Sequence, residues 1–220
     1  MKARAVVLLS GGLDSAVALY YALKNGYECR PLTFDYGQRH ACEIECAKLL
    51  SKALRLESKI LKLSMPWIES GLFGENMLPE GYGNYIPGRN TIFLSIAASF
   101  AETIGASTVF IGANAGDADN YHDCRRDYLD GFNALLTMGT KKGGKGELRI
   151  ERPFIDRDKS EIIRLGHSLG VPFQHTVSCY NGGVKPCMKC EACVKRRDGF
   201  KAAGIDDPLV VRHTEFTVSV

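Results

Sequence analysis

Short runs of apolar residues alternate along this chain with longer stretches in which apolar residues recur at helical spacing. Such runs and stretches predict strands and helices respectively. The predicted strands cover 5–9, 29–34, 58–63 and 108–111, and the predicted helices run up to residue 24 and over 43–54 and 90–104. Because strands alternate with helices, we expect an α/β fold with a Rossmann-like, doubly wound parallel sheet.

The C-terminal half gives fewer periodic signals. Asp158 and Glu161 match the two positions of a capping box, which predicts a helix from there to residue 169. Segment 141–146, Lys-Lys-Gly-Gly-Lys-Gly, has no apolar anchor. We expect a solvated linker there, with a mobile lid over a bound ligand as the alternative. Residues 209–211 and 214–220 have the composition of short strands.

Length and composition narrow the class of protein. The chain has 220 residues, of which 45% are hydrophobic, enough for one core with a small appendage. We divide it into an α/β domain, 1–170, and a small C-terminal helical segment, 171–220, packed on that domain. The N-terminus does not resemble a signal peptide, and no apolar stretch approaches the ~20 residues that span a bilayer. We therefore expect a cytoplasmic protein with no membrane partner.

A net charge of +3 is too small to predict a nucleic-acid partner. The eight cysteines are more informative, because clustered cysteines in a reducing compartment point to metal binding or catalysis rather than to disulfides.

One junction between a predicted strand and a predicted helix carries the clearest chemical signal. Ser10-Gly11-Gly12-Leu13-Asp14-Ser15 lies there. The glycines let the backbone approach a ligand, and the free N–H groups at the start of a helix attract an anion. The turn has neither the lysine of a Walker A loop nor the spacing of a dinucleotide-binding loop. We expect a polyphosphate here; the alternative is a helix start merely capped by Asp14 or Ser15.

This turn resembles the PP-loop of the ATP pyrophosphatases, which split ATP between its α- and β-phosphates and adenylate a substrate oxygen. The resemblance implies that ATP binds here with Mg²⁺. It also implies that Lys159, in Pro-Phe-x-x-x-x-Lys-x-Glu, faces the pyrophosphate and stabilises its charge. The implied ATP-binding residues are Leu9, Ser10, Gly11, Gly12, Leu13, Asp14, Ser15, Ala16 and Lys159.

Four thiols lie close together near the C-terminus. Cys187, Cys190 and Cys193 form two overlapping Cys-x-x-Cys units, and Cys179 lies eight residues upstream. Four thiolates are a preferred ligand set for structural zinc, which leaves no open position for chemistry. We expect one structural Zn²⁺ per chain; the alternatives are an iron–sulfur cluster and redox-active or inert thiols.

Two of the remaining cysteines, Cys42 and Cys46, lie one helical turn apart. They are interpreted as small apolar residues rather than as half of a metal site. Cys124 lies in a segment expected to line a pocket, so a binding role is open for it.

Four polar segments complete the pattern, at 35–40, 86–90, 112–126 and 154–159. Three of them follow predicted strands, and ligands of open α/β sheets bind beyond the carboxyl ends of the strands. We therefore expect these segments to wall one pocket.

Several motifs along residues 5–200 together resemble one branch of the PP-loop enzymes, the 7-cyano-7-deazaguanine synthase family. They are Leu-Ser-Gly-Gly-Leu-Asp-Ser at 9–15, Phe-Asp-Tyr-Gly-Gln-Arg-His at 34–40, Pro-Gly-Arg-Asn at 87–90, Gly-Ala-Asn at 112–114, Asp-Cys-Arg at 123–125 and Ser-Cys-Tyr at 178–180. The resemblance implies an ATP-dependent carbon–nitrogen ligase. Such an enzyme converts 7-carboxy-7-deazaguanine and ammonia to the nitrile of queuosine biosynthesis, by adenylation, amidation and dehydration of the amide. A homodimer acting on small molecules, without nucleic acid, is expected.

Roles can be assigned residue by residue on this resemblance. Asp14, Lys159 and Arg89 are the predicted catalytic residues. The predicted substrate-binding residues are Tyr36, Arg39, Arg89, Asn90, Asp119, Tyr121, Asp123 and Arg125. Arginines would grip a carboxylate or phosphates, aspartates would accept from the guanine-like edge, and tyrosines would stack on the base. His40 and His122 are candidates for proton transfer, and Asp14 and Asp123 for Mg²⁺.

Two other functions fit parts of the pattern. A PP-loop enzyme that thiolates tRNA would need a reactive cysteine near the loop and an RNA-binding region, and the chain has no appended domain large enough. A zinc-ribbon-like nucleic-acid module with a regulatory nucleotide site would use the basic residues at 195–197. It would not need the many polar pocket segments.

Overall fold

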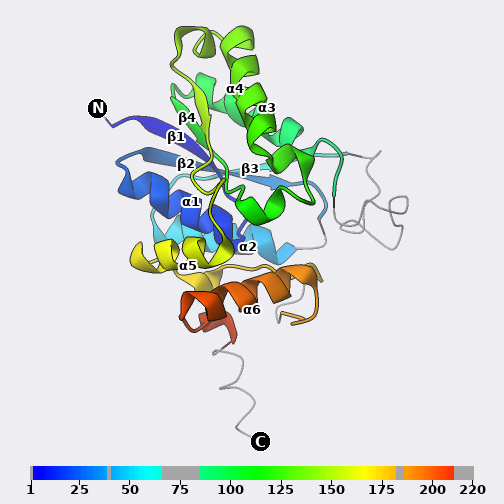
Figure 1. Cartoon of the computed structure of the whole chain (residues 1–220). Helices are drawn as coiled ribbons and strands as arrows, with labels where there is room; N and C mark the ends of the chain where they lie inside the picture. The colour runs from blue at the N-terminus through cyan, green and yellow to red at the C-terminus, as the bar shows by residue number, and fades with distance from the viewer. Residues whose placement is uncertain (1, 39–40, 66–84, 182–185, 211–220) are drawn as a thin grey trace, which may run out of the picture.

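The computed structural model describes residues 2–38, 41–65, 85–181 and 186–210. Within them lies a sheet of five parallel strands in the order β3-β2-β1-β4-β5 (Figure 1). The strands are β1 (Arg4–Leu8), β2 (Glu28–Asp35), β3 (Lys59–Lys62), β4 (Thr108–Phe110) and β5 (Arg149–Glu151). The predicted parallel α/β sheet is therefore confirmed.

Besides the helical residues 208–210, six α-helices and four short 3-10 helices surround the sheet in the described residues. The α-helices are α1 (Leu13–Lys24), α2 (Ala41–Ala53), α3 (Arg89–Thr103), α4 (Arg126–Gly139), α5 (Lys159–Ser168) and α6 (Glu191–Ala203). The 3-10 helices are η1 (Ala115–Asp117), η2 (His122–Cys124), η3 (Gly143–Lys145) and η4 (Phe173–His175). None of the helices in the described ranges combines the length and apolarity needed to cross a membrane.

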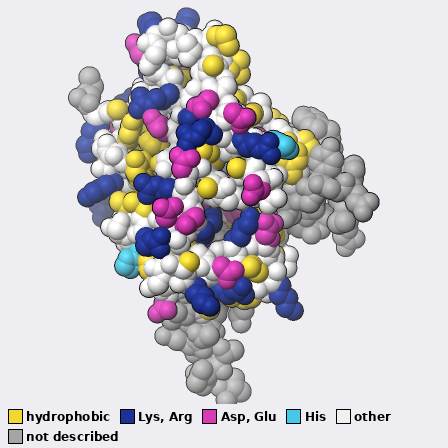
Figure 2. Space-filling view, in the orientation of Figure 1, with side chains coloured by type: hydrophobic (Ala, Val, Ile, Leu, Met, Phe, Trp, Pro, Cys, Tyr) yellow, Lys and Arg dark blue, Asp and Glu magenta, His cyan; other side chains and the backbone are white. Residues whose placement is uncertain are grey.

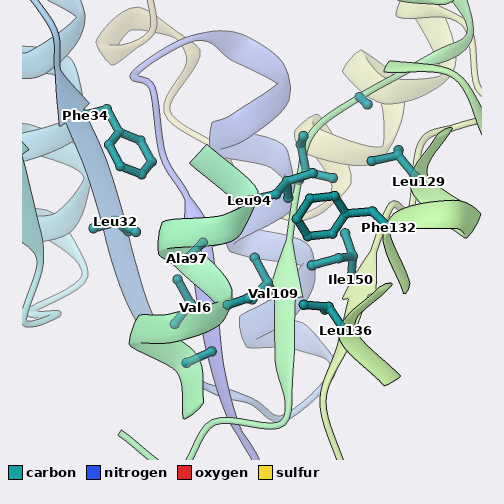
Figure 3. Packing of buried hydrophobic residues seen from close by; sticks show 14 of the residues in the cluster. Val6, Leu32, Phe34, Leu94, Ala97, Val109, Leu129, Phe132, Leu136 and Ile150 are labelled. Carbon is teal, nitrogen blue, oxygen red and sulfur yellow. The ribbon is translucent and has the colours of Figure 1, made fainter. Parts of the chain in front are cut away.

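The core has two halves, one on each face of the sheet. On one face α3 and α4 pack on β1, β4 and β5, and Figure 3 shows Leu94 and Ala97 from α3 and Phe132 from α4 meeting Val109 and Ile150. On the other face α1, α2 and α5 bury their apolar sides, and α6 packs beside α5 (Figure 1). From β1 the sheet extends in two directions, with β2 and β3 on one side and β4 and β5 on the other. The strand order therefore has a switch point between β1 and β4.

Local sequence explains where α5 begins and α1 ends. The Asp158 carboxylate accepts from the Glu161 N–H, and the Glu161 carboxylate accepts from the Asp158 N–H, which confirms the capping box. After α1, the Gly26 N–H donates to the Leu23 carbonyl and the Tyr27 N–H to the Ala22 carbonyl. Gly26 has φ +85°, which ends the helix without the steric cost of a side chain.

Segment 141–146 is largely exposed, as expected for a solvated linker, but it has a defined structure. It forms η3 against the end of α4, and the Lys142 N–H donates to the Glu102 carboxylate at 2.8 Å. Gly143 lies so close to the Leu136 carbonyl that a Cβ there would come within 2.0 Å of its oxygen. The segment therefore packs beside the end of α3, at the edge of the sheet opposite the Ser-Gly-Gly turn, and the lid hypothesis is wrong.

The strand prediction at 209–211 is wrong for the two residues that the structure describes. Leu209 and Val210 are helical, because Asp207 caps a turn that has Pro208 at its first position. Residue 211 and the predicted strand 214–220 lie outside the described residues.

The face shown in Figure 2 carries both kinds of charge. Lysine and arginine side chains alternate there with aspartate and glutamate side chains over the helices of Figure 1. This face therefore presents no extended field of one sign.

Candidate active site

A cavity of about 320 Å³ opens at the carboxyl edge of the sheet, at the switch point between β1 and β4. The turns after β1, β2 and β4 line it, together with the start of α3, Lys159 of α5, part of α6, and Val177, Ser178 and Tyr180. Segments far apart in the sequence thus meet where an open α/β sheet binds its ligand.

The Ser-Gly-Gly turn forms one end of this cavity. Gly12 is the N-cap of α1 and no side chain caps the helix, so the first N–H groups of α1 are left for a ligand. The alternative of a helix start merely capped by Asp14 or Ser15 is therefore not what the structure shows. Ser15 Oγ instead lies 3.0 Å from Ser10 Oγ and donates to the Gly12 carbonyl at 2.9 Å. These contacts hold both hydroxyls at the turn.

Gly11 fixes the path of this turn. It has φ +87°, and a Cβ on it would lie 2.1 Å from the carbonyl oxygen of Glu43. Only glycine fits this position, because both the conformation and the space exclude a side chain. The turn is thereby packed against the start of α2.

Lys159 reaches this turn from the first residue of α5. Its Nζ donates to both carboxylate oxygens of Asp14, at 2.7 and 2.6 Å, and both side chains are about one quarter exposed. The capping box places the helix start at Asp158, and the first-turn lysine then points at the glycine turn rather than into solvent. The position of Lys159 is therefore set both by the local capping box and by its contact with Asp14, which is distant in the sequence.

Asp117 is a lining residue that the sequence analysis missed. It closes a capping box with Asn114, whose side-chain amide donates to the Asp117 carboxylate at 2.7 Å. Burial and the charge of Asp14 raise the pKa of Asp117 to about 6. The glycine turn therefore has two carboxylates and one lysine at its mouth, an arrangement suited to a cation.

Aromatic side chains line the other end of the cavity. Phe93 of α3 stacks on Phe34 of β2, with ring centroids 4.0 Å apart, and lies at 56° to Tyr36. Arg89 Nη1 donates to the Tyr36 hydroxyl at 3.3 Å. Tyr121 and Tyr180 line the same cavity. This end combines flat apolar surfaces with one guanidinium group.

The start of α3 is held from the segment after β4. The Asp123 carboxylate accepts from the Asn90 N–H at 3.0 Å, and Asn90 Nδ2 donates to Cys124 Sγ at 3.2 Å. Asp123 is only 6% exposed and does not line the cavity, whereas Asn90 and Cys124 do. Burial raises the pKa of Cys124 to about 12, so its thiol is neutral near pH 7.

The other sequence-predicted residues divide into three groups. Leu9, Leu13 and the remaining turn residues line the cavity, but Gly11 and Ala16 do not. Asp119 and His122 are exposed, and Arg125 donates to the Ala118 carbonyl at 3.0 Å; none of the three lines the cavity. Arg39 and His40 lie outside the described residues. Their assigned roles stay predictions.

Glu43 is a second lining residue that sequence reasoning missed, because it is a first-turn glutamate of α2, a position typical of a solvated side chain. Burial raises the pKa of Glu43 to about 7, and Arg89 opposes this rise. The folded protein therefore disfavours the charged form of Glu43.

Glu43→Gln is expected to stabilise the ligand-free protein at about pH 8 by about 2–3 kcal/mol, and much less at about pH 5. The sign follows from the pKa, because the ordinary value is 4.5 and the folded value is about 7. The penalty for the charged form grows as the pH rises between those values. Urea unfolding of both proteins at both pH values measures the difference in the free energy of unfolding. Glu45→Gln, on the exposed side of α2, is the control. An equal gain at both pH values would contradict the assignment.

The four C-terminal thiols lie together. The sulfur atoms of Cys179, Cys187, Cys190 and Cys193 are all within 4.8 Å of one another. The Cys187 N–H donates to Cys179 Sγ and the Cys190 N–H to Cys187 Sγ, both at 3.3 Å, which favours thiolates. A tetrahedral site with bonds of about 2.3 Å needs sulfur atoms about 3.8 Å apart, so this set fits a metal ion.

The segment after η4 joins these thiols to the glycine turn. The Val177 N–H donates to the Gly11 carbonyl at 3.0 Å, and Gly12 forms a parallel bridge with Val177. Arg196 of α6 binds the Asp207 carboxylate through two nitrogens, at 2.6 and 2.9 Å, and donates to Thr176 Oγ1 at 2.8 Å. The thiols, α6 and the glycine turn therefore form one continuous structure.

Known proteins resemble this chain along most of its length. The family model described as queuosine biosynthesis protein QueC matches residues 4–204. A 7-cyano-7-deazaguanine synthase of Picrophilus torridus is 46% identical over 216 residues, which cover 94% of this chain and 90% of the relative. One of Saccharophagus degradans is 43% identical and covers 93% of this chain and 96% of the relative.

Solved structures support the fold. An NMN synthetase from Francisella tularensis has a TM-score of 0.50 at 16% identity, covering 93% of this chain and 78% of that one. An NH3-dependent NAD synthetase from Campylobacter jejuni has a TM-score of 0.50 at 19% identity, covering 79% and 66%. At these identities the likeness concerns the fold alone. The family match and the close relatives show more: the chain belongs to the QueC family of queuosine biosynthesis proteins.

Proposed function

We propose that this chain converts 7-carboxy-7-deazaguanine, ammonia and ATP to 7-cyano-7-deazaguanine in queuosine biosynthesis. The proposal rests above all on the contact between Lys159 and Asp14 at a glycine turn whose helix N–H groups have no side-chain cap. That end of the cavity suits a polyphosphate, and the aromatic end suits a planar base.

The phosphate end holds the pyrophosphate group. The N–H groups at the start of α1, with the hydroxyls of Ser10 and Ser15, donate to the phosphate oxygens. Lys159 moves from Asp14 to the pyrophosphate as charge grows on the leaving oxygen, and its ammonium group stabilises that charge. Mg²⁺ accompanies ATP, and Asp14 and Asp117 are the carboxylates at this end that would hold it.

The base end orients the substrate. Tyr36, Phe93 and Tyr121 offer flat surfaces to the deazapurine ring, and Arg89 offers a guanidinium group to the carboxylate. Asn90 and Asp123 act differently from each other. Asp123 fixes the start of α3, and this contact keeps Asn90 and Arg89 at the cavity wall.

The chemistry requires an activated oxygen twice. A carboxylate oxygen attacks the α-phosphorus, pyrophosphate leaves, and ammonia then displaces AMP to give the amide. The amide oxygen attacks a second ATP in the same way, and loss of a proton and of AMP gives the nitrile. Acid, ammonia and two ATP thus balance to nitrile, two AMP and two pyrophosphate. One cavity serves both steps if the base stays in place.

The four thiols are proposed to hold one structural Zn²⁺ per chain. Four sulfur ligands close the coordination sphere, so the metal would fix the thiol segment and the start of α6. We also keep the division into residues 1–170 and 171–220, a homodimer and a cytoplasmic location as proposals.

Mass spectrometry of the purified protein with 7-carboxy-7-deazaguanine, ammonium and ATP·Mg²⁺ tests the function. We expect the acid to become the nitrile while AMP and pyrophosphate accumulate. If AMP formed only with another carboxylate or with tRNA, the proposed cleavage of ATP would stand but the proposed substrate would be wrong. An absence of ATP cleavage under all these conditions would contradict the proposed enzymatic activity.

A further inference from the structure

Helix α6 touches the side chain on which the proposed chemistry depends. Gly199 is buried in α6, where it faces the first turn of α5. A Cβ added to Gly199 would lie 2.5 Å from Lys159 Cγ, 3.1 Å from Lys159 Cβ and 3.0 Å from Ile163 Cδ1. The first of these distances is far inside van der Waals contact, and it involves the base of the lysine side chain rather than its mobile end.

We propose that Gly199 is a positioning residue for Lys159: its missing side chain leaves the channel through which Lys159 extends to Asp14. The proposal deepens the function proposed above and rests on it for the role of Lys159. Without that channel, Lys159 must take another rotamer, and its Nζ no longer reaches the mouth of the glycine turn.

Helix α6 cannot simply move aside, because it is anchored on both sides of Gly199. Cys190 and Cys193 tie its first turn to the thiol cluster. Arg196, which is 4% exposed, binds Asp207 and the Thr176 hydroxyl. Phe200 packs edge-on against Phe173, with ring centroids 5.2 Å apart. The position of α6 is therefore set independently of Lys159, and a methyl group at 199 acts on the lysine.

The same anchors connect the thiol cluster to the cavity by two routes. One runs through Arg196 and Thr176 to Val177, which bridges to Gly12. The other runs through Gly199 to Lys159. The C-terminal segment thus shapes the phosphate end as well as stabilising the chain.

A double-mutant cycle tests the second route. Calorimetry measures the dissociation constant of ATP·Mg²⁺ for the wild-type protein, Gly199→Ala, Lys159→Ala and the double variant, with zinc content and melting temperature as folding controls. Gly199→Ala is expected to weaken ATP binding about tenfold, as for the loss of one charge-assisted hydrogen bond. The Lys159→Ala background lacks the Cγ atom. There, Gly199→Ala is expected to change the dissociation constant of ATP·Mg²⁺ by less than about twofold.

Gly131→Ala is the matched control, because Gly131 is exposed in α4 with nothing within 4 Å of its added Cβ. It should leave ATP binding unchanged. No weakening by Gly199→Ala, or equal weakening in both backgrounds, would overturn the proposal. If Gly199→Ala does not fold, the double variant must fold, and a double variant that also fails would overturn it. The experiment measures ATP binding, so its result does not depend on whether the protein forms the nitrile.

Discussion

Lys159→Met is expected to lower the rate of nitrile formation by about 1,000-fold, the largest effect of any single substitution proposed here. Methionine keeps the length of the side chain and the contacts of its Cβ and Cγ, but it has no charge for the pyrophosphate. The start of α5 is capped by Asp158 and Glu161, so the helix should remain. Release of AMP and pyrophosphate, followed by mass spectrometry, measures the loss.

Two comparisons separate chemistry from folding in this experiment. Lys145→Met removes an exposed lysine in η3, on the opposite edge of the sheet, and should leave turnover unchanged. The melting temperature of Lys159→Met should stay near that of the wild-type protein. Wild-type turnover in Lys159→Met would show that the lysine does not serve the phosphate end.

Cys190→Ser is expected to lose zinc and to lower the melting temperature by about 10 °C, because a structural metal site contributes several kcal/mol to folding. Cys190 is the N-cap of α6 and belongs to the thiol cluster. Loss of the metal frees the start of α6, which in turn loosens Arg196 and its hold on Thr176. Turnover should fall with the metal content. Elemental analysis and thermal melting measure both.

Cys46→Ser provides the matched control for this prediction. Cys46 is a partly buried thiol of α2 outside the four-thiol cluster, so its variant should retain the metal. A metal-free Cys190→Ser protein with full activity and wild-type stability would remove the structural role of the metal. Iron with sulfide in the purified protein would instead identify a cluster.

Much of the fold follows from local sequence. The apolar runs and helical stretches correspond to β1–β4 and α1–α3, and the capping box marks the start of α5. The glycine turn was predictable for the same reason, because strand, turn and helix are adjacent in the chain. The thiol cluster was predictable from its Cys-x-x-Cys spacing, which brings the ligands together over a few residues.

The rest depends on contacts between distant segments. Glu43 and Asp117 carry ordinary helix-start signals in the sequence, and only the packing of α2 and η1 at the cavity makes them lining residues. Asp123 is the opposite case. Its sequence position predicts a substrate-binding carboxylate, but in the structure this carboxylate accepts from the Asn90 N–H. Segment 141–146 is held by Glu102, which lies 40 residues from Lys142 in the sequence.

Transfer of oxygen from the acid to AMP would show adenylation by this cavity. The protein is incubated with ATP·Mg²⁺, ammonium and 7-carboxy-7-deazaguanine labelled with oxygen-18 at both carboxylate positions, and the nucleotides are weighed by mass spectrometry. We expect two AMP molecules per nitrile, each with one labelled oxygen on its phosphate. Unlabelled AMP, or ADP with labelled orthophosphate, would contradict attack of the substrate oxygen on the α-phosphorus.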